Sequence, residues 1–270
     1  MSKKPSSRDL TTLFSWGYWG WGTSAPELVK ATDAVEAARD FNPPVFVDIR
    51  LLRGGRAPGF RGDTFKKLVG DSRYHWIDDL GNAAIRRGRR QVSIKNPAAV
   101  DRLLDLALRC RKTNQRVIFF CACQVPGTPA EIGCHRLVVA GLVLEAAAKR
   151  GTSVEVVEWP GGEPRLSGFE IKVSDAAFRA LRSGRKTIVL PTGFSLSEMA
   201  GLPFGSIAKI RSAEAPQSYL YAVTGPAQFK KSGWCLPVHE TLELGAPVAS
   251  IKESARDLRE RWGYKPRRQV

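Results

Sequence analysis

The stretch NPAAVDRLLDLALRCRKTNQRVIFFCAC, residues 96–123, decides the fold class, because it predicts an amphipathic helix followed directly by a buried strand. Asn96 and Pro97 suit the N-cap and the first position of a helix over 98–112. The apolar residues of this helix recur at helical spacing and predict one buried face, formed by Val100, Leu103, Leu104, Ala107 and Leu108. The apolar run over 117–123 is typical of a strand covered on both faces of a parallel sheet.

Strands and helices alternate in this way over residues 1–160. Short apolar runs predict the strands, and capped or periodic segments predict the helices. The expected strands are 13–16, 45–49, 117–123 and 154–157, and the expected helices are 24–40, 98–112 and 137–149. The alternation predicts an α/β domain with a parallel sheet covered by helices.

The segment Pro160-Gly161-Gly162-Glu163-Pro164 breaks this pattern. Beyond it, Ser174 suits the N-cap of a helix that runs to about Ser183, and a small mixed or barrel-like module is expected. Its expected strands are 187–190, 206–211 and 219–224. The sequence therefore predicts an α/β domain over 1–160, a Pro/Gly linker over 161–168, a second domain over 169–248, and a C-terminal helix with a basic tail over 249–270.

The chain is strongly basic, because 42 Lys and Arg against 26 Asp and Glu give a net charge of +16. Such a charge indicates a polyanionic partner, of which nucleic acid is the most common. With 43% hydrophobic residues, the chain is not disordered as a whole. Its longest apolar run, 137–144, is far shorter than the roughly 20 residues of a membrane-spanning helix, so we expect no membrane partner.

Five cysteines are too few for a disulfide framework and indicate reduced thiols. The polar segment 1–10 lacks the apolar core of a signal peptide, so we expect a cytoplasmic protein.

The motifs Cys-Ala-Cys at 121–123 and Cys-His-Arg at 134–136 come where a strand ends and a helix begins, which is where α/β sheets place their sites. Three interpretations are open. Cys134 could be a nucleophile whose thiolate is favoured by a helix N-terminus and by Arg136. A zinc ion could be held by Cys121, Cys123, Cys134 and His135, although the C-x-C-x10-C-H spacing departs from that of most zinc sites. Cys121 and Cys123 could also be small buried residues of the strand. We favour the last interpretation for these two cysteines and a functional role for the Cys-His-Arg motif, and we expect no metal.

The start of the helix that follows is also open. Thr128 and Glu131 have capping-box spacing, which would begin the helix early and place Cys134 in its second turn. Gly133 favours a later start, because a glycine inside a helix costs about 1 kcal/mol relative to alanine.

Asp48 and Arg50 end the expected strand 45–49 and open a cationic loop that contains Arg53 and Arg56. Such a loop suits phosphate binding, whereas the alternative is that Asp48 and Arg50 form a structural ion pair. A second basic patch predicts nucleic-acid contacts, unless it is a solvated loop: Arg86, Arg87, Arg89 and Arg90.

These motifs, taken in order over residues 10–160, resemble domain-of-unknown-function family 488. The matching positions are Asp48, Arg50, Cys134, His135 and Arg136. The resemblance implies a Rossmann-like α/β fold and assigns no settled activity. The loop 124–133 is longer than in that family.

Residues 165–245 resemble an ASCH domain of the PUA-like superfamily, in which a helix ending in Gly-Arg/Lys-Lys-Thr precedes a small β-barrel. The matching residues include Arg185, Lys186 and Thr187. The resemblance implies a module that binds RNA or modified nucleotides, with Arg185 and Lys186 contacting phosphate or a base edge. Acetylcytidine amidohydrolases of this superfamily carry Thr and Arg where this chain has Val189 and Pro191, so we expect a binder.

The leading hypothesis is an enzyme acting on a nucleic acid or nucleotide. Cys134 would be the nucleophile or general acid and His135 the proton carrier, while Asp48 would orient or act as a base. Arg50 and Arg136 would bind a phosphate. The alternatives are a non-catalytic DNA- or RNA-binding protein and a small-nucleotide hydrolase or transferase.

Overall fold

The computed structural model describes part of the chain. The described residues are 10–18, 24–55, 57–87, 92–123, 134–160, 166–183, 187–190, 207–214, 218–223, 228–230 and 233–243. The chain divides into two compact units, the first ending at Glu158 and the second beginning at Trp159.

The first unit is built on a five-stranded sheet in which every neighbouring pair is parallel. The strands are β1 (Thr11–Gly17), β2 (Val45–Asp48), β3 (Tyr74–Trp76), β4 (Val117–Cys121) and β5 (Val154–Glu158). Their order across the sheet is β3-β2-β4-β1-β5, so β4 lies between β1 and β2. The expected Rossmann-like α/β domain is therefore confirmed as a parallel sheet with helices.

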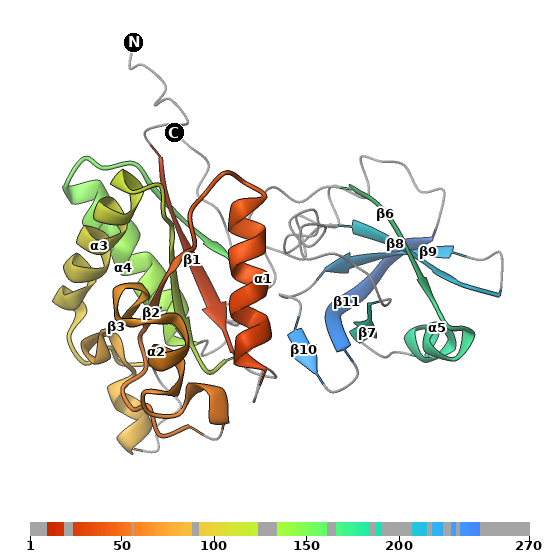
Figure 1. Cartoon of the computed structure of the whole chain (residues 1–270), viewed down its shortest axis with the longest axis horizontal. Helices are drawn as coiled ribbons and strands as arrows, with labels where there is room; N and C mark the ends of the chain where they lie inside the picture. The colour runs from red at the N-terminus through yellow and green to blue at the C-terminus, as the bar shows by residue number, and fades with distance from the viewer. Residues whose placement is uncertain are drawn as a thin grey trace, which may run out of the picture. The chain divides into compact units, whose positions relative to one another are not determined.

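The helices cover both faces of this sheet (Figure 1). They are α1 (Ala25–Ala37), α2 (Thr64–Val69), α3 (Val100–Lys112) and α4 (His135–Lys149). Helix α1 lies on one face and α3 and α4 on the other, while α2 packs against α1. The chain passes from β1 to β2 and β3 toward one edge of the sheet, and then from β3 to β4 and β5 toward the other edge. Right-handed crossovers that run in opposite directions place their helices on opposite faces.

Local capping sets the helix starts as the sequence predicts in two cases. The Asn96 side chain accepts a hydrogen bond from the Ala98 amide, 3.2 Å away, and a short 3-10 helix, Pro97–Ala99, leads into α3. In the second unit, the Ser174 hydroxyl accepts one from the amide of Ala177, at 3.3 Å.

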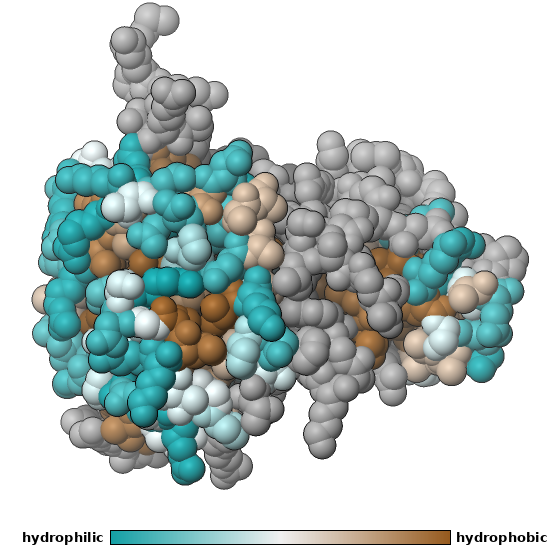
Figure 2. Space-filling view, viewed as in Figure 1, coloured by the Kyte–Doolittle hydropathy of each residue, from teal (hydrophilic) through white to brown (hydrophobic). Residues whose placement is uncertain are grey.

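The sheet separates two cores of different composition. Val45 and Val47 of β2 pack with residues of α3 and α4 in an aliphatic core. Successive strand residues point to opposite faces, so Phe46 and Asp48 face the other core. That core is aromatic and contains Trp16, Tyr18, Phe46, Phe60, Phe65 and Phe120. On the face shown in Figure 2, hydrophilic residues dominate the surface of the first unit.

Two elements of the first unit are missing from the sequence prediction. Strand β3 has only three residues, too few for a period-two pattern, and Trp76 is 38% exposed. Helix α2 has six residues and buries only Phe65 and Val69.

The second unit contains a six-stranded mixed sheet with the order β10-β11-β9-β8-β6, and β7 pairs with β11. Only β6 and β8 are parallel. Its elements are β6 (Leu166–Val173), α5 (Asp175–Arg182), β7 (Thr187–Val189), β8 (Ile207–Ser212), β9 (Ser218–Val223), β10 (Gln228–Lys230) and β11 (Gly233–Glu243). The expected helix and three expected strands are found, whereas β6, β10 and β11 were not predicted. The predicted helix within 249–270 and residues 161–165 of the predicted linker lie outside the described residues, whereas residues 166–168 of the linker begin strand β6.

Within the described residues, no helix combines the length and the apolar character needed to cross a membrane.

Candidate functional site

The candidate site lies at the carboxyl edge of the parallel sheet, beside the neighbouring strands β2 and β4. The connection after β2 runs toward the β3 edge, and the connection after β4 runs toward β5. Neighbouring strands whose connections diverge leave a crevice in which α/β proteins place their ligands. The residues just past these two strands are Ile49 and Arg50 after β2 and Ala122 and Cys123 after β4.

The structure decides where Cys134 lies relative to α4. Cys134 has an extended backbone, with φ −72° and ψ 145°, and is the N-cap residue of a helix that begins at His135. Its sulfur accepts a hydrogen bond from the Arg136 amide at 3.5 Å. The alternative that placed Cys134 in the second turn of a helix is therefore wrong, and the helix dipole acts directly on this sulfur.

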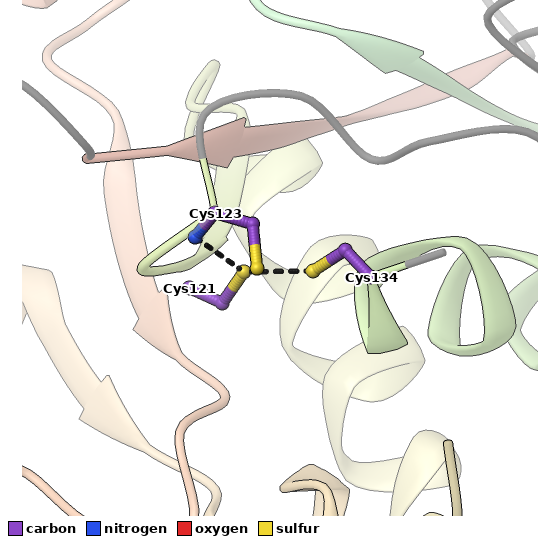
Figure 3. Close-up of side chains that lie close together, drawn as sticks. All are labelled: Cys121, Cys123 and Cys134. Carbon is purple, nitrogen blue, oxygen red and sulfur yellow. Dashed lines mark hydrogen bonds between the residues drawn. The ribbon is translucent and has the colours of Figure 1, made fainter. Parts of the chain in front are cut away.

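Three cysteine sulfurs gather at this helix N-terminus (Figure 3). Cys121 Sγ lies 3.0 Å from Cys134 Sγ, and the sulfurs of Cys121, Cys123 and Cys134 all lie within 4.8 Å of one another. Cys121 and Cys134 are buried, whereas Cys123 is exposed. Cys121 belongs to the buried strand β4, as the packing interpretation requires, but its sulfur also contacts Cys134. For Cys123 that interpretation is wrong, because β4 ends at Cys121 and Cys123 is exposed.

The three thiols have very different pKa values. Hydrogen bonds from Cys121 and then Cys123 lower the pKa of Cys134 far below that of an ordinary thiol and outweigh its burial. Burial raises the pKa of Cys121. The pKa of Cys123 is lowered by the hydrogen bond with Cys121, but the bond to Cys134 and burial raise it to about 11. Of the three thiols, Cys134 is therefore the one whose ionised form is favoured.

The tautomer of His135 follows from its hydrogen bonds. Its Nε2 lies 3.1 Å from the Ile49 carbonyl oxygen, and a carbonyl only accepts, so Nε2 carries the proton. In the neutral ring, Nδ1 then has a free lone pair, 3.7 Å from Cys134 Sγ. His135 is thus oriented to exchange a proton with Cys134.

Arg136 is fully buried and connects the site to three strands of the sheet. Its Nη1 donates to Glu158 Oε1 at 2.7 Å and to Ser15 Oγ at 3.2 Å, and its Nη2 donates to the Cys123 carbonyl at 3.1 Å. Burial raises the pKa of Glu158 to about 7, against the lowering effect of Arg136. Arg136 therefore links β1, β4, β5 and α4.

Asp48 and Arg50 form a separate buried pair on the aromatic face of the sheet. Arg50 Nε donates to Asp48 Oδ1 at 2.8 Å and its Nη2 to Oδ2 at 2.5 Å. Tyr74 donates its hydroxyl to the same carboxylate at 2.8 Å, and Arg50 also donates to the Tyr18 hydroxyl and the Phe60 carbonyl. The structural ion pair considered above is therefore present, and no direct contact joins Asp48 to Cys134 in the described part of the chain.

The expected cationic residues are only partly described. Arg53 pairs with Asp63 at 2.5 Å and lies over the Trp76 ring at 4.2 Å. Arg86 and Arg87 end a short 3-10 helix, Ala83–Arg87, but their side chains are outside the description. Five residues of the prediction lie outside the described residues altogether: Arg56, Arg89, Arg90, Arg185 and Lys186.

Sequence reasoning missed three residues of the site. Glu158 and Ser15 contact Arg136. Gly17 leaves room for the backbone of Cys123, because a Cβ at Gly17 would lie 1.5 Å from the Cys123 carbonyl oxygen. The signal for two of them was the end of a strand: Glu158 is an acidic residue at the end of β5, and Gly17 ends β1.

Comparison of the chain with protein-family models, with characterised proteins and with solved structures finds no match. The resemblances to family 488 and to ASCH domains remain predictions.

Proposed function

We propose that this chain is an enzyme acting on a nucleic acid or nucleotide through Cys134, His135 and Arg136. The observation that supports it is the position of Cys134 at the N-cap of α4, with the Nδ1 lone pair of His135 3.7 Å from its sulfur. A thiol next to a base at a helix N-terminus is the arrangement of an activated nucleophile.

In the proposed reaction, the proton of the Cys134 thiol resides on His135 Nδ1, so Cys134 attacks as the thiolate. The sulfur forms a bond to an electrophilic phosphorus or carbon of the substrate, and the leaving group departs with the bonding electron pair and takes up that proton. Water then cleaves the covalent intermediate and restores the thiol.

Arg136 and the Asp48–Arg50 pair act in this proposal as positioning residues. The guanidinium of Arg50 pairs with Asp48 and that of Arg136 with Glu158, both buried carboxylates. Of the two roles considered for Asp48, orienting other groups or acting as a base, the orienting role therefore fits better. In this proposal the N-terminus of α4 and Arg53, in the loop after β2, attract the anionic substrate.

The second unit is proposed to bind the nucleic acid as a PUA-like module, with Arg185 and Lys186 at its contact surface. The net charge of +16 supports a polyanionic partner, DNA or RNA. Reduced thiols at the site suit a cytoplasmic location.

The test compares wild type, Cys134→Ala and Cys110→Ala as metal-stripped, reduced full-length proteins. The substrates are single-stranded and duplex DNA, RNA and mononucleotides. Cys110 is a buried thiol on α3 outside the cluster, so its variant controls for loss of a buried sulfur. We expect Cys134→Ala to abolish turnover while binding persists. Equal turnover in Cys134→Ala and wild type contradicts the proposal.

One observation favours a non-catalytic nucleic-acid-binding protein instead. Cys134 is only 8% exposed, which suits a structural thiol. In that case binding occurs without turnover of any substrate class.

A further inference from the structure

The three cysteines of the site form a ligand set as well as a thiol cluster. Sulfurs that share one zinc ion at about 2.3 Å each lie about 3.8 Å apart in tetrahedral geometry. Here the sulfurs of Cys121, Cys123 and Cys134 lie within 4.8 Å of one another, and the Cys121–Cys134 distance is 3.0 Å. Shifts of less than about 1 Å would bring all three onto one ion.

The surroundings of the sulfurs suit metal-bound thiolates. The amide of Cys123 donates to Cys121 Sγ at 3.4 Å, and that of Arg136 donates to Cys134 Sγ at 3.5 Å. Hydrogen bonds of this kind orient ligands and stabilise their charge. Three thiolates and Zn²⁺ carry one net negative charge, which is stabilised by the nearby Arg136 guanidinium that Glu158 also contacts.

A fourth ligand is also at hand. His135 donates its Nε2 proton to a backbone carbonyl, as metal-bound histidines commonly do, and its Nδ1 lies 3.7 Å from Cys134 Sγ. Nitrogen and sulfur on one zinc ion lie about 3.5 Å apart. Either this nitrogen or a water molecule completes the tetrahedron.

We propose that Cys121, Cys123 and Cys134 bind a zinc ion at the N-terminus of α4, and that the bound ion masks Cys134. Coordination to zinc withdraws electron density from a thiolate sulfur and lowers its nucleophilicity, so bound zinc slows thiol chemistry at Cys134. Only this masking rests on the proposed function. The zinc site itself is independent of it.

The zinc site is tested with Co²⁺, which takes zinc sites and has thiolate charge-transfer absorption in the near ultraviolet. Reduced, chelator-stripped full-length protein is titrated with Co²⁺ and then with Zn²⁺. We expect one equivalent of Co²⁺ to bind with this absorption, and Zn²⁺ to displace it.

The diagnostic variant is Cys123→Ser, because Cys123 is exposed and its change leaves the buried sulfurs in place. We expect its Co²⁺ affinity to fall by more than about 100-fold, since losing even an outer hydrogen-bond partner costs about 10–100-fold. The Cys110→Ala control should bind as wild type does. Absence of the absorption in wild type, an unchanged signal in Cys123→Ser, or an equal loss in Cys110→Ala overturns the zinc site.

Masking is tested by the rate at which iodoacetamide alkylates Cys134, read by mass spectrometry with and without zinc. We expect bound zinc to slow this rate at least about tenfold. An equal rate in zinc-loaded protein overturns the masking. The proposed function fails by a different result, unchanged turnover of zinc-free Cys134→Ala.

Discussion

At the scale of single residues, the chemistry of the site depends on which buried charged side chains pair with one another. Hydrogen bonds from the neighbouring thiols lower the pKa of Cys134, and Arg136 is held between Glu158 and the Cys123 carbonyl. The second buried pair, Asp48 with Arg50, is saturated by hydrogen bonds on the other face of the sheet. Two predictions follow from these pairs.

Replacing Asp48 by Asn leaves the Arg50 guanidinium buried without its counter-charge. We expect the free energy of unfolding in urea to fall by about 3–5 kcal/mol. The matched control is Asp63→Asn, since Asp63 pairs with Arg53 but its side chain is 55% exposed, and its loss should cost less than about 1 kcal/mol. Similar losses in the two variants would show that Asp48 is not a structural anchor.

Glu158 makes stability depend on pH. Its pKa of about 7 in the folded state exceeds its ordinary value of 4.5, so between these values the folded state binds more protons than the unfolded state. Stability from this group is therefore present at low pH and is lost as the pH rises toward 7, with a slope of at most about 1.4 kcal/mol per pH unit. We expect urea unfolding from pH 4.5 to 7 to show a shallower loss in Glu158→Gln, whatever its absolute stability. An identical slope in both proteins would rule out Glu158 as its source.

At the scale of elements, the cluster forms because the turn after β4 folds against the end of β1. The Tyr18 amide donates to the Cys121 carbonyl at 3.1 Å, and Gly17 leaves room for the Cys123 carbonyl oxygen. The same turn places Cys123 opposite the N-cap of α4. A side chain on β1 is therefore expected to disturb the cluster without changing any of its sulfurs.

Gly17→Ala tests this close approach. The new Cβ cannot lie 1.5 Å from the Cys123 oxygen, so the turn must move, and we expect a loss of stability of about 1–3 kcal/mol together with altered alkylation of Cys123. Gly141→Ala is the control, because a Cβ there meets nothing within 4 Å and lies inside helix α4. It should stabilise the protein by about 0.5–1 kcal/mol. Unchanged stability and labelling in Gly17→Ala would contradict the described contact.

At the scale of the whole molecule, the dominant property is the charge of +16. If the partner is nucleic acid, each phosphate neutralised by Lys or Arg releases counterions, and log affinity falls by about 0.9 per phosphate for each tenfold rise in salt on duplex DNA. We expect a slope that corresponds to several phosphates, measured by fluorescence anisotropy on labelled DNA and RNA between low and physiological salt. A flat salt dependence with tight mononucleotide binding would instead identify a small-nucleotide enzyme.

The Cys134–His135–Arg136 part of the site could be predicted from the sequence more fully than the Asp48–Arg50 part. The positions of Cys134, His135 and Arg136 at a strand–helix junction are visible in the sequence, because helix caps and buried strands are local patterns. Asp48 was also expected at the sheet edge, and it lies there. Its side chain points into the aromatic core, however, because residue 48 has the parity of Phe46 and not that of Val47.

The sequence by itself determined strands β1, β2, β4 and β5 and helices α1, α3 and α4, since hydrophobic period and capping act over a few residues, but it did not reveal the short α2 and β3. Only the tertiary structure decided that β4 lies between β1 and β2, and that Cys121, Cys123 and Cys134 meet across a spacing atypical of zinc sites. Strand order depends on which faces pack best over long sequence separations, and no local pattern records it. The contacts of Arg136 with Ser15 and Glu158 follow from the same order, because β1 and β5 are neighbours in the sheet.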